Sequence, residues 1–358
     1  MIIPQSNPAA NHAKPGRWAS DLARMTSTYL PILPMPLTLG AMIIGLALLA
    51  WGGERFILGA SATARNLGVS PVLVGLTIVG FATSAPEMLV SALAAWSGTP
   101  GLAIGNAVGS NIANLGLVLG AAVLIRPLVA QSRTLRRELP ALLASTFLPF
   151  LLLLDGELSA LDAAVLLAAL GILVYWLAFL GYHASVLDPI RAEYAAEIRA
   201  DLTMTGAVVW LVIGMTALLA GAELLVLGAT SAARTLGISE LVIGLTVVAI
   251  GTSLPEFAVS IAAAYKNEPD LVLGNVIGSN IFNMLAVVGI AGLIAPHHID
   301  PELLTMHYPA MAAMTLGVFI LTYNRGQRRG RLGRRSGAAI LGSFFLYHGV
   351  VAYQALAQ

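Results

Sequence analysis

The chain has 358 residues, of which 58% are hydrophobic and 10% are charged, and 19 Lys and Arg residues nearly balance 18 Asp and Glu residues. With a mean hydropathy of +0.84, this composition excludes a water-soluble globular protein, and a net charge of +1 gives no basis for binding nucleic acid. The absence of cysteine excludes disulfide bonds and thiolate metal sites.

Apolar runs long enough to cross a hydrocarbon core of about 30 Å predict an all-α polytopic membrane protein with ten transmembrane helices. A tail at 1–36 lacks the pattern of a cleaved signal peptide and is expected to be a mobile or interfacial extension. Five spans fall within residues 37–184 and five within 203–358, and a linker at 185–202 joins the two sets. In chain order the predicted spans are 37–60, 72–96, 102–125, 138–154, 160–182, 206–230, 240–265, 271–294, 303–323 and 337–356.

Two pairs of motifs repeat with one constant spacing. GLTIVGFATSAPE at 75–87 corresponds to GLTVVAIGTSLPE at 244–256, and GNAVGSNIAN at 105–114 corresponds to GNVIGSNIFN at 274–283. Both pairs are offset by 169 residues, which predicts an internal duplication. Because each copy has an odd number of spans, the second copy must enter the membrane from the opposite side. The sequence therefore predicts two inverted-topology five-helix repeats, a common architecture of secondary transporters.

The basic residues predict the orientation, because Lys and Arg in short loops favour the cytoplasmic side. Of the 19 Lys and Arg residues, 15 fall in loops that follow odd-numbered spans, when Arg55 near the end of the first span is counted with the loop that follows it. We therefore expect both termini on the non-cytoplasmic side and the 185–202 linker in the cytoplasm. This linker is too short to hold a folded calcium-sensing domain.

Glu87 and Glu256 are the acidic residues that lie well inside apolar runs, and they occupy equivalent positions in the two copies. An ionisable group in hydrocarbon costs at least about 2.5–3.5 kcal/mol, so such a residue usually faces a polar cavity or a partner. The alternative is a protonated glutamate that hydrogen-bonds to a neighbouring backbone group. The duplication favours a functional site.

Each of these glutamates follows a proline, which removes a backbone donor and disturbs the preceding turn. The freed carbonyls belong to Ala82, Thr83 and Ser84 in the first copy, and to Gly251, Thr252 and Ser253 in the second. Carbonyl, hydroxyl and carboxylate oxygens are hard ligands that suit Ca²⁺ and also Na⁺. The alternative is a simple proline kink whose hydroxyls bond back along the helix.

The next span of each copy combines small and polar residues. Ser110 and Asn114 lie four residues apart and share a helix face, as do Ser279 and Asn283, so this face can offer neutral oxygens to a cation. A purely structural role is the other possibility, in which small residues allow close helix packing and amides link neighbouring helices.

At these motifs the chain resembles the cation/calcium exchanger superfamily, and most closely its prokaryotic sodium/calcium exchanger branch. The resemblance covers roughly residues 40–300. It implies a ten-helix antiporter in the cell (inner) membrane, with four ion sites between the second, third, seventh and eighth helices. The first and sixth helices would slide across this core. No cofactor is expected, the substrates would be Ca²⁺ and Na⁺ in a lipid bilayer, and a monomer is compatible with this picture.

The resemblance also implies the ligands. Glu87 and Glu256 would be the principal calcium ligands, together with backbone oxygens of Thr83 and Thr252. Asn114 and Asn283 would complete the polar centre. Sodium would use the same carboxylates with Ala82, Ser84, Ser110, Gly251, Ser253 and Ser279.

Two features depart from the family pattern. Ala82 stands where glycine is common, a minor change if only its carbonyl is used. Some relatives have an acid in place of Asn283, and calcium/proton members have one where this chain carries Gly109 and Gly278. The missing acids favour sodium over proton coupling.

Two fixed negative charges in a low-dielectric pocket require neutralising cations, which one Ca²⁺ or several Na⁺ can supply. If the empty site cannot readily change sides, competition for shared ligands produces exchange. We therefore expect Ca²⁺ export driven by Na⁺ entry, and no enzymatic activity. A Ca²⁺/H⁺ antiporter using the same carboxylates is the main alternative. An ion channel, or an intramembrane hydrolase without a clear nucleophile and base, are alternatives from other classes.

Overall fold

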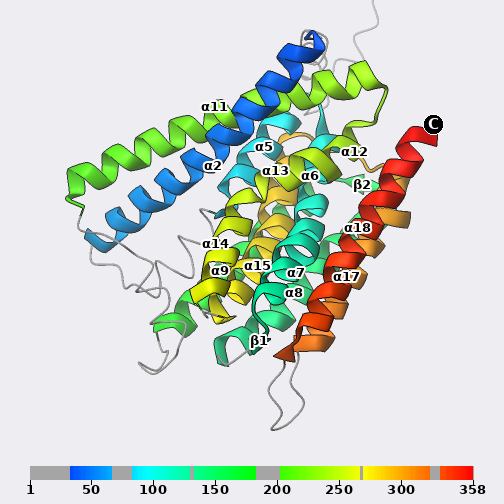
Figure 1. Ribbon diagram of the computed structural model, residues 1–358. Helices are drawn as coiled ribbons and strands as arrows, with labels where there is room; N and C mark the ends of the chain where they lie inside the picture. Colours follow the sequence, from blue (N-terminus) through cyan, green and yellow to red (C-terminus); the bar gives the residue numbers. More distant parts are fainter. Residues whose placement is uncertain are drawn as a thin grey trace, which may run out of the picture.

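The computed structural model describes residues 33–66, 83–129, 133–182, 202–266, 269–322 and 331–357, and nearly all of them are helical (Figure 1). The first half contains α2 (Met35–Asn66), α5 (Ala85–Trp96), α6 (Pro100–Ala113), the π-helical turn η2 (Asn114–Val118), α7 (Leu119–Ile125), α8 (Arg133–Leu152), the short 3₁₀ turn η3 (Leu153–Asp155) and α9 (Ala160–Tyr182).

The second half is built in the same order. It contains α11 (Met204–Leu236), α12 (Glu240–Ile243), η4 (Gly244–Val248), α13 (Ala249–Thr252), α14 (Leu254–Lys266), α15 (Pro269–Phe282), η5 (Asn283–Val287), α16 (Val288–Ile294), η6 (Leu303–His307), α17 (Tyr308–Thr322) and α18 (Arg334–Ala357).

The structure is that of a polytopic helical membrane protein. Within the described residues, six helices are long and apolar enough to cross a membrane, and one further candidate span is broken by a bend of 44° between Thr252 and Leu254. Two shorter apolar helices cover Leu139–Asp155 and Ala160–Trp176. The predicted span 72–96 is described only from residue 83, and almost all of the 1–36 extension and the 185–202 linker lie outside the described residues.

The two longest helices, α2 and α11, lie against each other in opposite directions (Figure 1). Glycines recur every seven residues along the contact. A Cβ atom added at Gly59 would lie 2.3 Å from the backbone nitrogen of Leu211, and one added at Gly214 would lie 2.3 Å from that of Phe56. The two backbones therefore touch directly, as small residues allow in membrane helices. The glycines concerned are Gly45, Gly52, Gly59, Gly214, Gly221 and Gly228.

The buried core lies to one side of this pair. Helix α5 packs on α6, α14 packs on α15, and α6 also packs against α12, η4 and α13. The close approach of α6 to α12 depends on glycine, because a Cβ atom on Gly105 would lie 2.5 Å from the carbonyl oxygen of Leu241. The pair of long helices contacts this core through α5, α12, η4, α13 and α14.

Two short antiparallel strand pairs, which the sequence did not predict, join loops of the first half to loops of the second. Strand β1 (Leu128–Val129) pairs with β4 (Arg331–Leu332), and β2 (Glu157–Leu158) pairs with β3 (His297–His298). The labels of β1 and β2 lie at opposite ends of the molecule in Figure 1.

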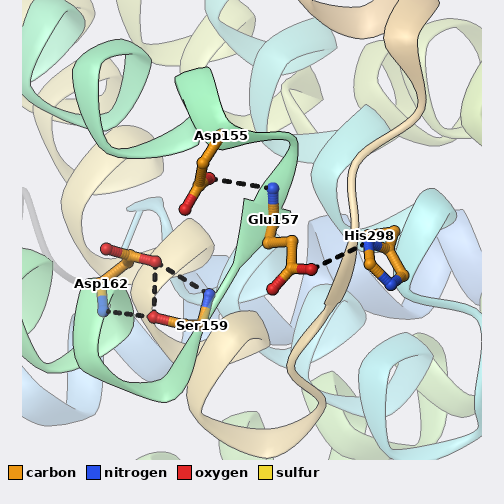
Figure 2. Close-up of polar contacts among 5 residues, drawn as sticks. All are labelled: Asp155, Glu157, Ser159, Asp162 and His298. Atoms are coloured by element: carbon orange, nitrogen blue, oxygen red, sulfur yellow. Dashed lines mark hydrogen bonds and ion pairs between the residues drawn. The ribbon is translucent and has the colours of Figure 1, made fainter.

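The β2–β3 end is held by polar contacts (Figure 2). The Nδ1 atom of His298 lies 3.3 Å from Oε1 of Glu157, and Oδ1 of Asp155 accepts the backbone N–H of Glu157 at 3.0 Å. Ser159 and Asp162 bond reciprocally at the start of α9, where Oδ2 of Asp162 accepts the Ser159 backbone N–H at 2.9 Å and Oγ of Ser159 accepts the Asp162 N–H at 3.2 Å. Such a capping box fixes where a helix begins.

Candidate cation-binding site

Glu87 and Glu256 are the third residues of α5 and α14, and both side chains are fully buried. Each helix starts after a break at a serine. Ser84 has φ −87° and ψ 4°, and Ser253 has φ −81° and ψ 6°. The prolines that follow have no backbone N–H, so the preceding helix cannot continue with its normal hydrogen bonds. The same local sequence thus produces the same helix start in both halves, at Ala85 and at Leu254.

The two carboxyl groups lie close enough to interact electrostatically with each other. Oε1 of Glu256 accepts a hydrogen bond from Oγ of Ser279 at 3.3 Å. The other Glu256 oxygen and both Glu87 oxygens are buried without a hydrogen bond, although the hydroxyls of Thr252 and Ser253 lie near Glu87. Buried charges that lack partners are costly, so this arrangement is suited to a bound cation.

Hydroxyl groups from the two halves meet in crossed pairs beside the carboxyls. Oγ1 of Thr83 lies 3.4 Å from Oγ of Ser279, and Oγ1 of Thr252 lies 3.3 Å from Oγ of Ser110. Because Thr252 is equivalent to Thr83 and Ser279 to Ser110, exchanging the two halves converts one pair into the other. The halves therefore contribute equally to one polar cluster.

Asn106 and Asn275 support the glutamates from the neighbouring helices. Nδ2 of Asn106 donates to the carbonyl of Glu87 at 3.3 Å and to Oγ of Ser91 at 3.0 Å. Nδ2 of Asn275 makes the equivalent bonds, at 3.1 Å to the carbonyl of Glu256 and at 2.9 Å to Oγ of Ser260. These contacts fix α5 against α6 and α14 against α15.

Sequence analysis missed Ser91 and Ser260 as part of this cluster. They lie four residues after the two glutamates and are themselves 169 residues apart. The repeat offset alone could therefore have revealed them. Their hydroxyls accept hydrogen bonds from the amides of Asn106 and Asn275 and so hold these side chains in place.

The remaining predicted residues lie around this cluster. Asn111 donates to the carbonyl of its own equivalent, Asn280, at 3.2 Å, so the two halves meet there. Asn114 and Asn283, which begin the π turns η2 and η5, have buried side chains whose polar atoms lack hydrogen bonds. The Oγ atoms of Ser84 and Ser253 are likewise buried without a hydrogen bond.

Two backbone positions complete the comparison with prediction. Gly251 packs under α2, because an added Cβ atom would lie 2.1 Å from a methyl group of Leu46. Ala82 lies outside the described residues. Within the part of the chain that the structure describes, no three His, Asp or Glu side chains group as metal ligands. A metal at this site would therefore be held by two carboxylates and neutral oxygens.

Two buried carboxyls at the starts of two apolar helices, one in each half, characterise this helical membrane protein. The sequence model of the sodium/calcium exchanger protein family matches residues 37–179 and 206–353. The chain therefore belongs to this family. Its relatives place it in the prokaryotic branch of the cation/calcium exchanger superfamily. The family consists of exchangers, which are transporters and not enzymes.

Similar proteins cover almost the whole chain. It is 45% identical to the putative antiporter CaxA of Alkalimonas amylolytica over 86% of this chain and 96% of the relative. It is 32% identical to the sodium/calcium exchanger MaX1 of Methanosarcina acetivorans, over 78% of this chain and 89% of the relative. The solved structure of the exchanger NCX_Mj, soaked with Na⁺ and Sr²⁺, is 33% identical and has a TM-score of 0.62 over 87% of this chain and 98% of that one.

Proposed function

We propose that the chain is an antiporter that exports Ca²⁺ in exchange for Na⁺, with Glu87 and Glu256 as the shared cation ligands. The observation that carries the proposal is the burial of these two carboxyls beside each other with three of their four oxygens unbonded. Two negative charges in a low-dielectric site are balanced by one Ca²⁺ or by several Na⁺. Since the same oxygens serve both ions, the two loads compete.

The other predicted ligands supply neutral oxygens around this charge. Thr83 and Thr252 lie directly before Ser84 and Ser253, and their hydroxyls contact Ser279 and Ser110. Such carbonyl and hydroxyl oxygens are the ligands that Ca²⁺ and Na⁺ prefer. The set that we assign to the two ions is Ala82, Thr83, Ser84, Glu87, Ser110, Asn114, Gly251, Thr252, Ser253, Glu256, Ser279 and Asn283.

The proposed topology is ten spans in two inverted repeats, residues 37–184 and 203–358, in the inner membrane with both termini non-cytoplasmic. Equivalent helices α2 and α11 run in opposite directions. Equivalent strands β1 and β3 belong to strand pairs labelled at opposite ends of the molecule. Both features support a pseudo-twofold axis within the membrane plane, as in other transporters whose site lies at the midplane.

Sodium coupling is favoured over proton coupling by the packing at Gly109. A Cβ atom there would lie 2.5 Å from the carbonyl oxygen of Leu245 and 2.7 Å from Cβ of Ala249. An acidic side chain at this position, as calcium/proton relatives are expected to have, does not fit between these helices. The first half thus has no room for that additional proton acceptor, whereas Gly278 has open space around it.

The proposal is tested by ⁴⁵Ca²⁺ uptake into Na⁺-loaded proteoliposomes at constant pH. We expect uptake that depends on the outward Na⁺ gradient, and loss of this uptake in Glu87→Gln and in Glu256→Gln. These variants keep the side-chain volume but remove the charge that a cation neutralises. Glu157→Gln, in an exposed strand at the end of the molecule, is the matched control and should retain wild-type uptake.

The same vesicles distinguish the alternatives. Uptake driven by a pH gradient without Na⁺ would establish the Ca²⁺/H⁺ antiporter instead. Normal uptake in either glutamate variant would contradict the assignment of the site.

A further inference from the structure

A polar cavity lies away from the glutamate site, between three elements that are distant in the sequence. Its volume is about 150 Å³, and its lining comes from the loop between α11 and α12, from the segment that leads into α17, and from the last turns of α18. In Figure 1 the C-terminal end of α18 and the short helix α12 both lie near the upper end of the molecule. The polar lining residues are Ser239, Asp300, Glu302, His307 and Gln354.

His307 is the side chain that points to a ligand. It is fully buried, and its Nδ1 lies 2.9 Å from the hydroxyl of Tyr347, whereas its Nε2 is buried without a hydrogen bond. Oε1 of Gln354, which lines the same cavity, is also buried and unbonded. Buried polar atoms without a hydrogen bond at a polar cavity are satisfied by water or by an ion.

The charge of the lining selects a cation. Asp300 and Glu302 contribute two carboxylates, and among the residues that the structure describes no Lys or Arg lines the cavity. One oxygen of Asp300 is already used, because its Oδ1 accepts the backbone N–H of Glu302 at 2.9 Å. Asp300 also lies close enough to His307 to interact with it electrostatically. A negative cavity with amide and hydroxyl oxygens attracts hard cations.

The geometry points to a cation that keeps its water shell. Within the described residues, Asp300, Glu302 and His307 do not converge as a direct metal-binding group. The cavity of about 150 Å³ instead has room for several water molecules. Mg²⁺-like ions dehydrate reluctantly and are commonly held through water with one or two carboxylates.

We propose that this cavity binds one hydrated divalent cation, held through its waters by Asp300, Glu302, Gln354 and Nε2 of His307. The site is distinct from the glutamate pair and shares no residue with it. A bound ion would connect the α11–α12 loop to α17 and α18. Because α11 packs along α2 and α12 leads into the helix of Glu256, occupancy would restrain the corner between them.

The test is equilibrium dialysis of the purified full-length protein against MnCl₂, with bound manganese counted by atomic absorption. Glu87→Gln combined with Glu256→Gln provides a background in which the proposed transport site is uncharged. In this background we expect one Mn²⁺ per chain, which MgCl₂ displaces at least as well as CaCl₂. Adding Asp300→Asn and Glu302→Gln should raise the Kd for Mn²⁺ by about tenfold or more.

Matched variants separate this site from general surface charge. Asp155→Asn with Glu157→Gln removes the same number of charges near the β2–β3 strands (Figure 2) and should leave Mn²⁺ binding unchanged. His307→Phe keeps a ring beside Tyr347 but removes both nitrogens, so it should weaken binding. If the glutamate double variant does not fold, the same comparisons are made on the otherwise wild-type chain.

The absence of Mn²⁺ binding, or binding that Asp300→Asn with Glu302→Gln leaves unchanged, would overturn the proposal. Displacement of the bound Mn²⁺ by Ca²⁺ but not by Mg²⁺ would likewise overturn the proposal that the ion keeps its water shell. Since dialysis does not require transport, failure here leaves the exchange proposal standing, and failed exchange leaves this site intact.

Discussion

Replacing Gly59 with alanine should force α2 and α11 apart. The new methyl group would meet three backbone atoms, at 2.3 Å from the nitrogen and 2.6 Å from the Cα of Leu211 and at 2.8 Å from the carbonyl oxygen of Ala207. Ordinary contacts between heavy atoms need about 3.5–4.0 Å. The helices must therefore separate by about 1 Å, because no flexible side chain is available to move instead.

The size of the effect follows from this geometry. Overpacking of this kind costs about 1–3 kcal/mol, and a gap of about 0.5–1 Å removes a quarter to a half of the dispersion energy of each affected contact. Alanine recovers up to about 1 kcal/mol over glycine through its higher helix propensity. We expect a net destabilisation of about 1–2 kcal/mol, seen as a lower melting temperature.

Gly40→Ala is the matched control in the same helix, since no atom lies within 4 Å of its added Cβ. It should gain helix propensity without overpacking and melt at or above the wild-type temperature. Tryptophan fluorescence during thermal unfolding in detergent can follow both variants, because the chain has five tryptophans. If the melting temperature of Gly59→Ala is no lower than that of Gly40→Ala, the inference that the backbones of α2 and α11 touch directly is wrong.

Two further outcomes follow from single contacts. Ser279→Ala removes the hydrogen bond to Oε1 of Glu256 at 3.3 Å and should raise the apparent KM for Ca²⁺ in ⁴⁵Ca²⁺ uptake by about 3–10-fold. The hydroxyl of Ser110 contacts Thr252 and not a carboxyl, so Ser110→Ala should raise the KM less. An equal rise in KM for both variants would contradict the role given to the Ser279–Glu256 hydrogen bond. Burial lowers the pKa of His297, against the opposing effect of its 2.8 Å hydrogen bond with the Ala295 carbonyl. Because folding disfavours its protonated form, the stability from this group is present above about pH 6.5 and is lost as the pH falls below that value. His297→Gln should therefore flatten the acid side of a plot of melting temperature against pH, and an unchanged slope would refute it.

The glutamate cluster could be located from the sequence because the duplication places the same unusual motif in both halves of the chain. A buried acid in an apolar run is unusual once, and the constant offset of 169 residues between Glu87 and Glu256 makes it informative. The helix break at Ser253 and the start of α5 after Ser84 followed from the prolines two residues further on. The predicted membrane character and family are confirmed, whereas the ion ligands and the ten inverted spans stay predictions.

Other features were not accessible from one sequence. The ranges 37–60 and 206–230 were too short for α2 and α11, which run over Met35–Asn66 and Met204–Leu236. Hydropathy reports where a helix faces hydrocarbon, but helical hydrogen bonding continues into more polar residues. The two-residue strands and the pairing of Thr83 with Ser279 depend on tertiary packing, which local patterns do not encode.

The crossed hydroxyl pairs have a consequence for how this chain can change over time. A gene duplication normally frees one copy to drift while the other preserves the original role. Here the partner of Thr83 lies in the second copy and the partner of Thr252 lies in the first, so a substitution in either copy alters a contact of the other. Around the glutamates, the two copies are therefore constrained to change together. Their sequences can diverge more freely at positions far from these contacts.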